Sequence, residues 1–155
     1  MSAFEQVNNI WVSLFREVME LEERAIITEE FKDITNNDMH IIEAVGLDEG
    51  NNMSTIAQKL SVTPGSLSIA MNSLVHKHYV ERRRSETDRR VVNITLTDKG
   101  KKAFNHHKEF HDQMTREALA SLSEEEIRAL VKSLGNLTKF FHRYSEGEEQ
   151  ADKTK

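Results

Sequence analysis

The chain has no cysteine, and its six glycines are scattered along the 155 residues. Without cysteine it can form no disulfide, no thiolate metal site and no cysteine-based redox sensor. The sequence also lacks a glycine-rich phosphate loop, a Gly-x-Ser-x-Gly motif and a His-Glu-x-x-His motif. We therefore expect a protein that is not an enzyme and that has no catalytic residue, no cofactor and no resident metal.

Long hydrophobic runs are missing as well. No stretch approaches membrane-spanning length, and the start of the chain lacks the basic and apolar segments of a signal peptide. We therefore expect a cytoplasmic protein with no membrane partner. The length fits one domain that carries helical extensions.

The net charge of −5 excludes a protein that coats nucleic acid through its overall charge. The distribution of charge is more informative. Residues 75–102 contain nine lysines and arginines against four acids, a local balance of +5 that leaves −10 on the rest of the chain. A basic island on an acidic body is typical of a directional DNA-binding face. The alternative interpretation is a solvated, charged hairpin.

The first predicted helix covers residues 3–27 and has a wide apolar face. Such a face has to pack against more than one neighbour, so we expect a second copy of the chain to cover part of it. The apolar residues at helical spacing are Phe4, Val7, Ile10, Trp11, Leu14, Phe15, Val18, Met19, Leu21 and Ile26. The next helix is expected to follow Thr35, which has cap-like spacing to Asp38, and to end at Gly46.

Two short helices joined by a turn are predicted for residues 54–78. Ser54 is expected to cap the first helix, and Thr63 the second, which begins at Pro64. Small hydroxyl and amide groups on the outer side of the second helix suit base edges and phosphates in a major groove, although they are also ordinary surface residues. This outer side consists of Ser66, Ser68, Ile69, Asn72 and Ser73.

A β-hairpin is predicted next, with strands at 79–84 and 92–96 around a turn at 85–88. Thr97 is expected to cap a long helix that reaches about Leu119. Ser123 and Glu126 have the spacing of a capping box that opens a last helix.

The predicted fold is mainly α with a small β-hairpin wing, that is, a winged helix-turn-helix with N- and C-terminal dimerisation helices. The chain after Tyr144 is too polar to pack, so we expect disorder there. The expected domains are an N-terminal dimerisation helix (1–34), the winged helix-turn-helix region (35–97), the C-terminal dimerisation helices (98–144) and a disordered tail (145–155).

Over residues 4–144 the sequence resembles the MarR family of dimeric winged-helix transcription regulators. The most specific part is Asp88-x-Arg90 followed by Ile94-Thr95-Leu96-Thr97-x-x-Gly100. The resemblance implies that the first and last helices interlock two chains, that the helix from Pro64 enters the major groove, and that the hairpin tip lies in the minor groove. It also implies that Arg90 is the minor-groove arginine, held by Asp88.

A narrower resemblance is to the FabT-type subgroup, which represses fatty-acid synthesis genes in Gram-positive cocci and lactobacilli. It rests on Phe31-Lys32-Asp33-Ile34, Met39-His40-x-Ile42-Glu43, Ser85-x-x-Asp88-Arg89-Arg90-Val91-Val92, His107-x-x-Phe110-His111 and Leu134-Gly135-Asn136-Leu137. This resemblance implies a corepressor, a long acyl chain on acyl carrier protein. The middle of the helix from Pro64 is Ile69-Ala70-Met71. We cannot match this composition to the operator contacts of the FabT-type subgroup.

These arguments yield two sets of candidate residues. We expect DNA contacts, on a pseudo-palindromic duplex, from Ser54, Thr63, Ser66, Ser68, Asn72, Arg84, Asp88, Arg89 and Arg90. We expect a ligand pocket lined by Trp11, Phe15, Met19, Phe31, Met39, Ile42, Phe104, His107, Phe110 and His111.

Three alternatives remain open at this point. The residues of the second set can simply form the dimer core. His107 and His111, four residues apart on one helical face, have a spacing that chelates zinc, with His40 able to approach from another helix. A helical dimer whose winged unit binds protein instead of DNA is the alternative of another functional class.

Overall fold

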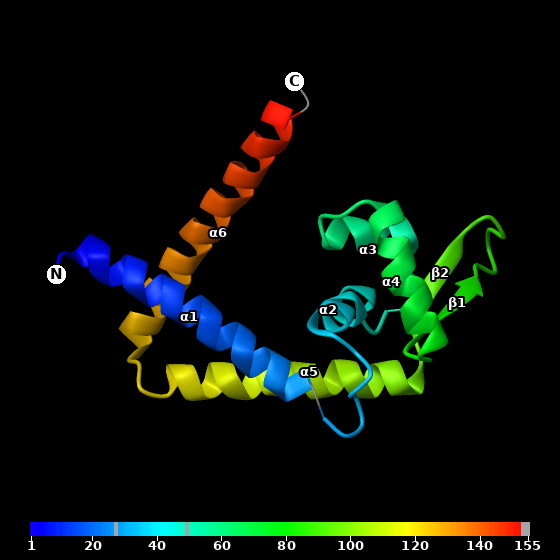
Figure 1. Ribbon diagram of the computed structural model, residues 1–155, viewed down its shortest axis with the longest axis horizontal. Coiled ribbons are helices and arrows are strands. Elements are labelled where there is room, and N and C mark those ends of the chain that lie inside the picture. The colour runs from blue at the N-terminus through cyan, green and yellow to red at the C-terminus, as the bar shows by residue number, and fades with distance from the viewer. Residues whose placement is uncertain (27, 49, 153–155) are drawn as a thin grey trace. The chain divides into compact units, whose positions relative to one another are not determined.

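Within residues 1–26, 28–48 and 50–152, which the computed structural model describes, the chain forms six helices and one two-stranded hairpin (Figure 1). Residues Met1–His111 form one compact unit, and the chain from Asp112 onward forms a second. The elements are α1 (Ala3–Ile26), α2 (Asn36–Val45), α3 (Met53–Lys59), α4 (Pro64–His76), β1 (Val80–Arg84), β2 (Val92–Leu96), α5 (Asp98–Leu119) and α6 (Glu124–Asp152). The predicted fold class is confirmed.

A single hydrophobic core holds the first unit together. The inner stripe of α4, which consists of Leu67, Met71 and Leu74, is buried. Removing one such side chain from water contributes about 1.5–3 kcal/mol, so this core dominates the stability of the winged unit. Its largest fully enclosed apolar residues are Ile26, Met39, Ile42, Ile56, Met71, Leu74, Tyr79 and Ile94.

The predicted ends of α2 are confirmed. Thr35 Oγ1 accepts a hydrogen bond from the Asp38 main-chain N–H at 3.1 Å, and Asp38 Oδ2 accepts one from the Thr35 N–H at 3.1 Å. This reciprocal capping box satisfies two of the main-chain donors that a helix start leaves free. Gly46 ends the helix at φ 69°, a left-handed value that favours glycine.

The cap of α3 differs from the prediction. Asn52, not Ser54, precedes the helix, and its Oδ1 accepts a hydrogen bond from the Thr55 N–H at 2.9 Å. The reason lies outside the local sequence. Asn52 forms an antiparallel bridge with Asn93, and the Asn51 carbonyl accepts from the Ile94 N–H at 2.7 Å. Pairing with the distant strand β2 therefore fixes the entry into α3 before Ser54 is reached.

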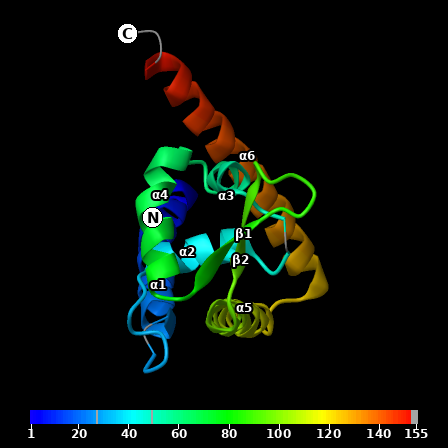
Figure 2. The ribbon, with the colours of Figure 1, turned by 90° about the vertical axis from the view of Figure 1, so that its right-hand side faces the viewer.

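The hairpin pairs β1 and β2 antiparallel, from Val80 opposite Leu96 at its base to Arg84 opposite Val92 near its tip. Figure 2 shows the two strands beside α3 and α4. At the base the inner residues are enclosed, with Ile94 fully buried, whereas the residues toward the tip are exposed. The wing is thus anchored at one end and open to solvent at the other.

The junction between β2 and α5 explains the Thr97-x-x-Gly100 motif. Thr97 Oγ1 donates a hydrogen bond to the His78 carbonyl at 2.6 Å and accepts one from the Gly100 N–H at 3.1 Å. A Cβ atom added to Gly100 would lie 2.0 Å from the Tyr79 carbonyl oxygen, far inside contact distance. Glycine at this position is therefore required by the close approach of α5 to the segment that follows α4.

The first and last helices leave apolar side chains uncovered. Along α1 only Ile26 is buried, while Phe4 is 81% and Phe15 63% exposed. On α6 exposed apolar residues are Leu130, Val131, Leu134, Phe140, Phe141 and Tyr144. Apolar surface on this scale typically marks an interaction site. No helix in the described part of the chain combines the length and apolar character needed to cross a membrane.

The chain beyond Tyr144 also differs from the prediction. Instead of becoming disordered at residue 145, the backbone stays helical to Asp152, and residues 153–155 lie outside the described part. The start of α6 is the predicted one, since Glu126 Oε2 accepts from the Ser123 N–H at 2.8 Å. Glutamate, glutamine and alanine are good helix formers, so an established helix can continue through this polar segment.

Candidate nucleic-acid interface

Helix α4 presents the outer face that the sequence predicts. Thr63 caps it through a hydrogen bond from the Ser66 N–H to Thr63 Oγ1 at 3.2 Å, and Pro64 occupies the first helical position. Ser66 and Asn72 are exposed, whereas Ser68 is half-buried. Ser54 is exposed on the neighbouring helix α3. The exposed face is short, polar and free of acidic side chains, as a major-groove element requires.

Ile69 is the most exposed large residue of this face, at 81%. An apolar side chain that points into solvent from the middle of a polar helix face has no role in the core. In a major groove, apolar groups contact the thymine methyl group, which distinguishes T·A from C·G pairs. The sequence places Ile69 on the outer side of the helix, but only its exposure makes it a candidate for base recognition.

Helix α4 and the wing are joined by a contact that the sequence does not predict. Arg82 Nη2, on β1, donates a hydrogen bond to Asn72 Oδ1, on α4. The wing is therefore held against the outer face of α4 by one of its own arginines. The adjacent Arg83 forms an ion pair with Glu81 of the same strand.

The wing tip is ordered by a network around Ser85 and Asp88. Ser85 Oγ accepts from the Asp88 N–H at 3.3 Å, and the Ser85 N–H donates to the Val91 carbonyl at 2.9 Å. Asp88 Oδ1 accepts from the main-chain N–H of Arg90 at 2.9 Å. Asp88 thus holds Arg90 through its main-chain N–H, which leaves the Arg90 guanidinium available.

Three lysines at the base of the wing are paired with acids. Lys77 Nζ lies 3.0 Å from Asp38 Oδ2, Lys99 Nζ lies 3.2 Å from Asp33 Oδ2, and Lys102 Nζ lies 3.6 Å from Glu30 Oε1. These pairs connect α5 and the end of α4 to α2 and to the segment before it. They serve the packing of the unit, so they are poor candidates for DNA contacts.

The arginines at the wing tip are not neutralised in this way. Within the described residues, no ion pair or hydrogen bond involves the side chain of Arg84, Arg89 or Arg90, and all three residues are exposed. Five of the nine cations in the basic segment are therefore arginines of the wing, and three of these five have no partner in that part of the chain. The free positive charge is concentrated at the tip.

The residues predicted to line a ligand pocket fall into separate groups. Phe31, Met39 and Ile42 are enclosed in the core of the winged unit, with exposures of 3%, 0% and 0%. They belong to the hydrophobic core there. Phe15 and Met19 are exposed on α1, Trp11 is half-buried on the same helix, and Phe104 and Phe110 are half-buried on α5.

A cavity of about 460 Å³ lies elsewhere on the unit, between α2 and the α3–α4 pair. None of the ten predicted pocket residues lines it. Its lining consists of Asn37, His40, Ile41, Leu60, Val62, Ser66, Leu67 and Ala70.

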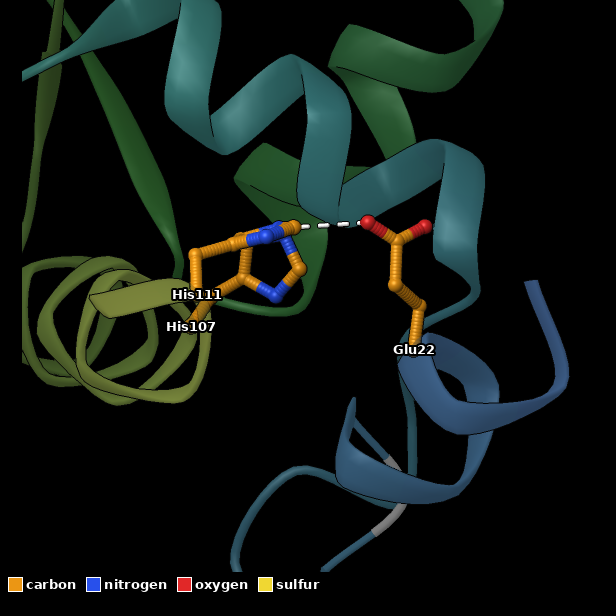
Figure 3. A group of neighbouring side chains, drawn as sticks. All are labelled: Glu22, His107 and His111. Atoms are coloured by element: carbon orange, nitrogen blue, oxygen red, sulfur yellow. Dashed lines mark hydrogen bonds and ion pairs between the residues drawn. The ribbon is translucent and has the colours of Figure 1, made fainter. Parts of the chain in front are cut away.

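His107 and His111 contact acidic groups as well as the ring of Phe110. His111 Nε2 lies 3.0 Å from His107 Nε2 and 3.2 Å from Glu22 Oε1 of α1. Figure 3 shows Glu22 pointing toward the two histidines. His107 Nε2 also lies 3.3 Å from Glu43 Oε1 of α2, whose other oxygen lies 3.3 Å from His40 Nδ1. Burial lowers the pKa of His107, so its neutral imidazole is favoured in spite of the nearby carboxylates.

The comparisons with known proteins agree with the winged architecture. Residues 25–107 match the family described as transcriptional regulator SarA/Rot. Among solved structures, the complex of Streptococcus pneumoniae FabT with DNA has 37% sequence identity and a TM-score of 0.83, over 90% of this chain and 97% of that chain. The S. aureus MepR–DNA complex has 26% identity and a TM-score of 0.67, over 86% of this chain and 99% of that chain.

Among curated proteins, the HTH-type transcriptional regulator PchR of Bacillus subtilis (strain 168) is 26% identical over 103 residues. That match covers 64% of this chain and 61% of PchR. All of these relatives are named as transcription regulators or were solved with DNA, and none is named as an enzyme. The chain belongs to the SarA/Rot family of transcriptional regulators and is a DNA-binding regulator with a winged helix of the MarR type.

Proposed function

We propose that this protein is a cytoplasmic, homodimeric repressor that binds a pseudo-palindromic operator and controls fatty-acid synthesis genes. The two copies would occupy half-sites about one helical turn apart. The observation that carries the proposal is the wing, where free arginines project from a hairpin that is tied to an exposed polar helix face through Arg82 and Asn72.

Direct contacts are assigned by the chemistry of each exposed group. Ser66, Asn72 and Ile69 on α4 would face base edges in the major groove, with Ser54, Thr63 and Ser68 near phosphates. At the tip, Arg90 would enter the minor groove, where a narrow groove has an enhanced negative potential. Arg84 and Arg89 would hold the phosphate backbone, and Asp88 would shape the turn that presents Arg90.

Dimerisation is assigned to the outer helices. The apolar residues that α1 and α6 expose are too numerous for a monomer surface, and covering them with a second copy would remove a large apolar area from water. A twofold dimer then supplies two winged units, which matches the twofold symmetry of a pseudo-palindrome.

The effector that we propose is a long acyl chain on acyl carrier protein, acting as a corepressor. Support comes from the FabT-type motifs in the sequence and from the 37% identity to FabT over most of both chains. The part of the predicted pocket that suits an acyl chain consists of Trp11, Phe15 and Met19 of α1 with Phe104 and Phe110 of α5. The acidic carrier would dock on Arg16, Arg24 and Lys32, which are exposed and lie apart from the wing.

Fluorescence anisotropy tests the function and its effector together. Labelled promoter fragments from fatty-acid synthesis genes of the source genome should bind tightly, and fragments from unrelated promoters should bind only as non-specific DNA. Long-chain acyl carrier protein should then tighten operator binding, while the unacylated carrier should not. Equal affinity for both promoter sets rejects the assigned target genes, and equal effects of the two carriers reject the corepressor.

A protein-interaction module is the competing function, and salt separates the two. Several phosphate contacts make DNA affinity fall steeply and log-linearly with salt concentration. A weak, shallow salt response combined with capture of a protein partner by the wing would favour the module.

A further inference from the structure

We propose that Asn72 recognises a guanine in the major groove, because Arg82 orients its side-chain amide so that only N–H donors are left for the DNA. Asn72 lies on α4 and Arg82 on β1, two elements that pack side by side (Figure 2). The residue that contacts the base and the residue that positions it therefore come from different elements of the winged unit. Helix α4 has to enter the major groove for this contact, so the inference rests on the proposed function.

The chemistry of the two side chains fixes the orientation of the amide. A guanidinium carries five N–H donors and no acceptor, whereas an asparagine side chain has one carbonyl oxygen and one NH₂ group. Arg82 can therefore bond only to the oxygen, and the structure contains this contact, from Arg82 Nη2 to Asn72 Oδ1. The NH₂ group is then the branch of the amide that is left for another partner.

Both side chains keep donors available. Asn72 and Arg82 are exposed, and within the described residues the contact between them is the only hydrogen bond that either side chain makes. Arg82 has no ion pair in that part of the chain, unlike the neighbouring Arg83, which is paired with Glu81. The pair of Asn72 and Arg82 therefore offers N–H donors to the groove, while its one acceptor oxygen already faces a positive charge.

The bases differ in the donors and acceptors that they present in the major groove. Guanine offers two acceptors, N7 and O6, whereas adenine offers the N7 acceptor beside the N6 donor, cytosine a donor and thymine one acceptor. An asparagine with a free oxygen pairs with adenine through both branches of its amide. Here the oxygen of Asn72 is engaged, and the adenine N6 group would meet the N–H donors of Arg82. Guanine is therefore favoured, and adenine is disfavoured.

The place of Asn72 on the helix favours a base contact over a phosphate contact. Asn72 follows Ile69 by three residues, so the two side chains share one face of α4. Ile69 is 81% exposed and has no polar side-chain atom, so it can contact the edge of a base but offers no hydrogen bond to a phosphate. The face of α4 that carries Ile69 therefore suits base edges, and Asn72 belongs to that face.

Selection of bound duplexes from a random DNA library by the full-length protein tests the inference. The base pair that Asn72 contacts is the one whose preference disappears in Asn72→Ala. We expect guanine there, preferred over adenine by about tenfold or more, as for a good bidentate contact. A parent protein that enriches no motif rejects the proposed operator binding itself. A parental motif that keeps every preference in Asn72→Ala, or that has adenine at the contacted position, overturns the inference alone.

Asn72→Asp tests the donor that faces the groove. The variant keeps the size of the side chain and its contact with Arg82, but the branch left for the DNA becomes an acceptor. The preference at the contacted position should therefore change from guanine to cytosine, whose N4 group donates. Retained preference for guanine contradicts a contact through the NH₂ group.

Arg82→Met tests the positioning role. Without the guanidinium the amide can rotate and bond to adenine through both branches, so the discrimination against adenine should be lost. Arg83→Met is the matched control, because Arg83 is on the same strand but is paired with Glu81, and it should retain the preference for guanine. Unchanged discrimination in Arg82→Met, or an equal loss in the control, overturns the role of Arg82. Circular dichroism of each variant checks that it is folded.

Discussion

At the tip of the wing, three arginines have no ionic partner within the described chain, whereas at the base three lysines are paired with acids of the same unit. The two groups are neighbours in sequence and contribute equally to the charge of the basic segment. They differ in what surrounds them. The base lies against α2 and the segment that precedes it, which supply Asp38, Asp33 and Glu30, while the tip extends into solvent.

This difference shows that a count of basic residues overstates the positive charge that a protein surface offers to nucleic acid. Charge that is already paired inside the protein gains little from a phosphate, because the existing pair has to be broken first. Unpaired charge on an ordered turn can contact a phosphate without the loss of an existing ion pair. Variants at the base should therefore change stability, and variants at the tip should change DNA affinity.

The largest effect, a decrease in stability, is expected from a substitution at the base of the wing. Gly100→Ala places a Cβ atom 2.0 Å from the Tyr79 carbonyl oxygen, and because this is a backbone atom it cannot simply rotate away. Overpacking commonly costs about 1–3 kcal/mol, and here we expect the upper end or more. Chemical denaturation measures the decrease in stability. Gly50→Ala is the matched control, since a Cβ there meets no atom within 4 Å. Equal stability of the two variants would refute the close-approach argument.

At the tip, Arg90→Ala should weaken operator binding by roughly 1–3 kcal/mol without changing the free energy of unfolding. The reason is that its guanidinium has no partner in the described part of the protein and that Asp88 holds only its main chain. A gel-shift titration beside a denaturation curve separates the two quantities. Arg83→Ala, which removes an arginine already paired with Glu81, is the control and should lose less affinity. Unchanged affinity for Arg90→Ala would remove the wing from the interface.

On α4, Ile69→Ser should reduce discrimination at one base pair with a small decrease in affinity. Contact with a thymine methyl removes about one methyl group from water, which is worth about 0.8 kcal/mol. Competition between operator variants, each with one T·A pair replaced by C·G, measures the effect. Stability should stay the same, because the side chain is 81% exposed. An operator preference identical to that of the parent would leave Ile69 outside the interface.

The smallest effect, again a decrease in stability, is expected when a paired lysine is replaced. Lys77→Ala leaves Asp38, which is 9% exposed, without its cation, and we expect a decrease of about 1 kcal/mol in stability after allowance for solvent screening. DNA affinity should not change. Lys101→Ala, at an exposed position, is the control for stability. A larger drop in DNA affinity than in stability would show that the base also contacts DNA.

Local signals in the sequence predict much of this fold. The capping residues Thr35, Thr63 and Ser123 and the Thr97–Gly100 turn act within a few residues, so their spacing alone identifies them. The cap at Asn52 cannot be found in this way, because its position depends on pairing with β2. For the same reason the contact between Arg82 and Asn72 is not predictable from local spacing.

The candidate sites differ in the same way, since some follow from local sequence signals and others depend on tertiary packing. The exposed face of α4 and the arginines of the wing follow from periodicity and turn position. The contacts of His107 and His111 do not, because Glu22 and Glu43 reach these histidines only when three helices are packed together. The predicted ligand-pocket residues share mainly an apolar character, and this property does not separate an exposed Phe15 from an enclosed Met39.

The salt dependence of operator binding tests the central claim most directly. Anisotropy titrations of the parent and of a variant with Arg84, Arg89 and Arg90 all changed to alanine give the slope of log affinity against log salt concentration. We predict that the slope of the variant is shallower by roughly 0.9 for each phosphate that it no longer neutralises, while Lys77→Ala retains the parental slope. Equal slopes for the parent and the triple variant would contradict a wing that reads DNA with its tip.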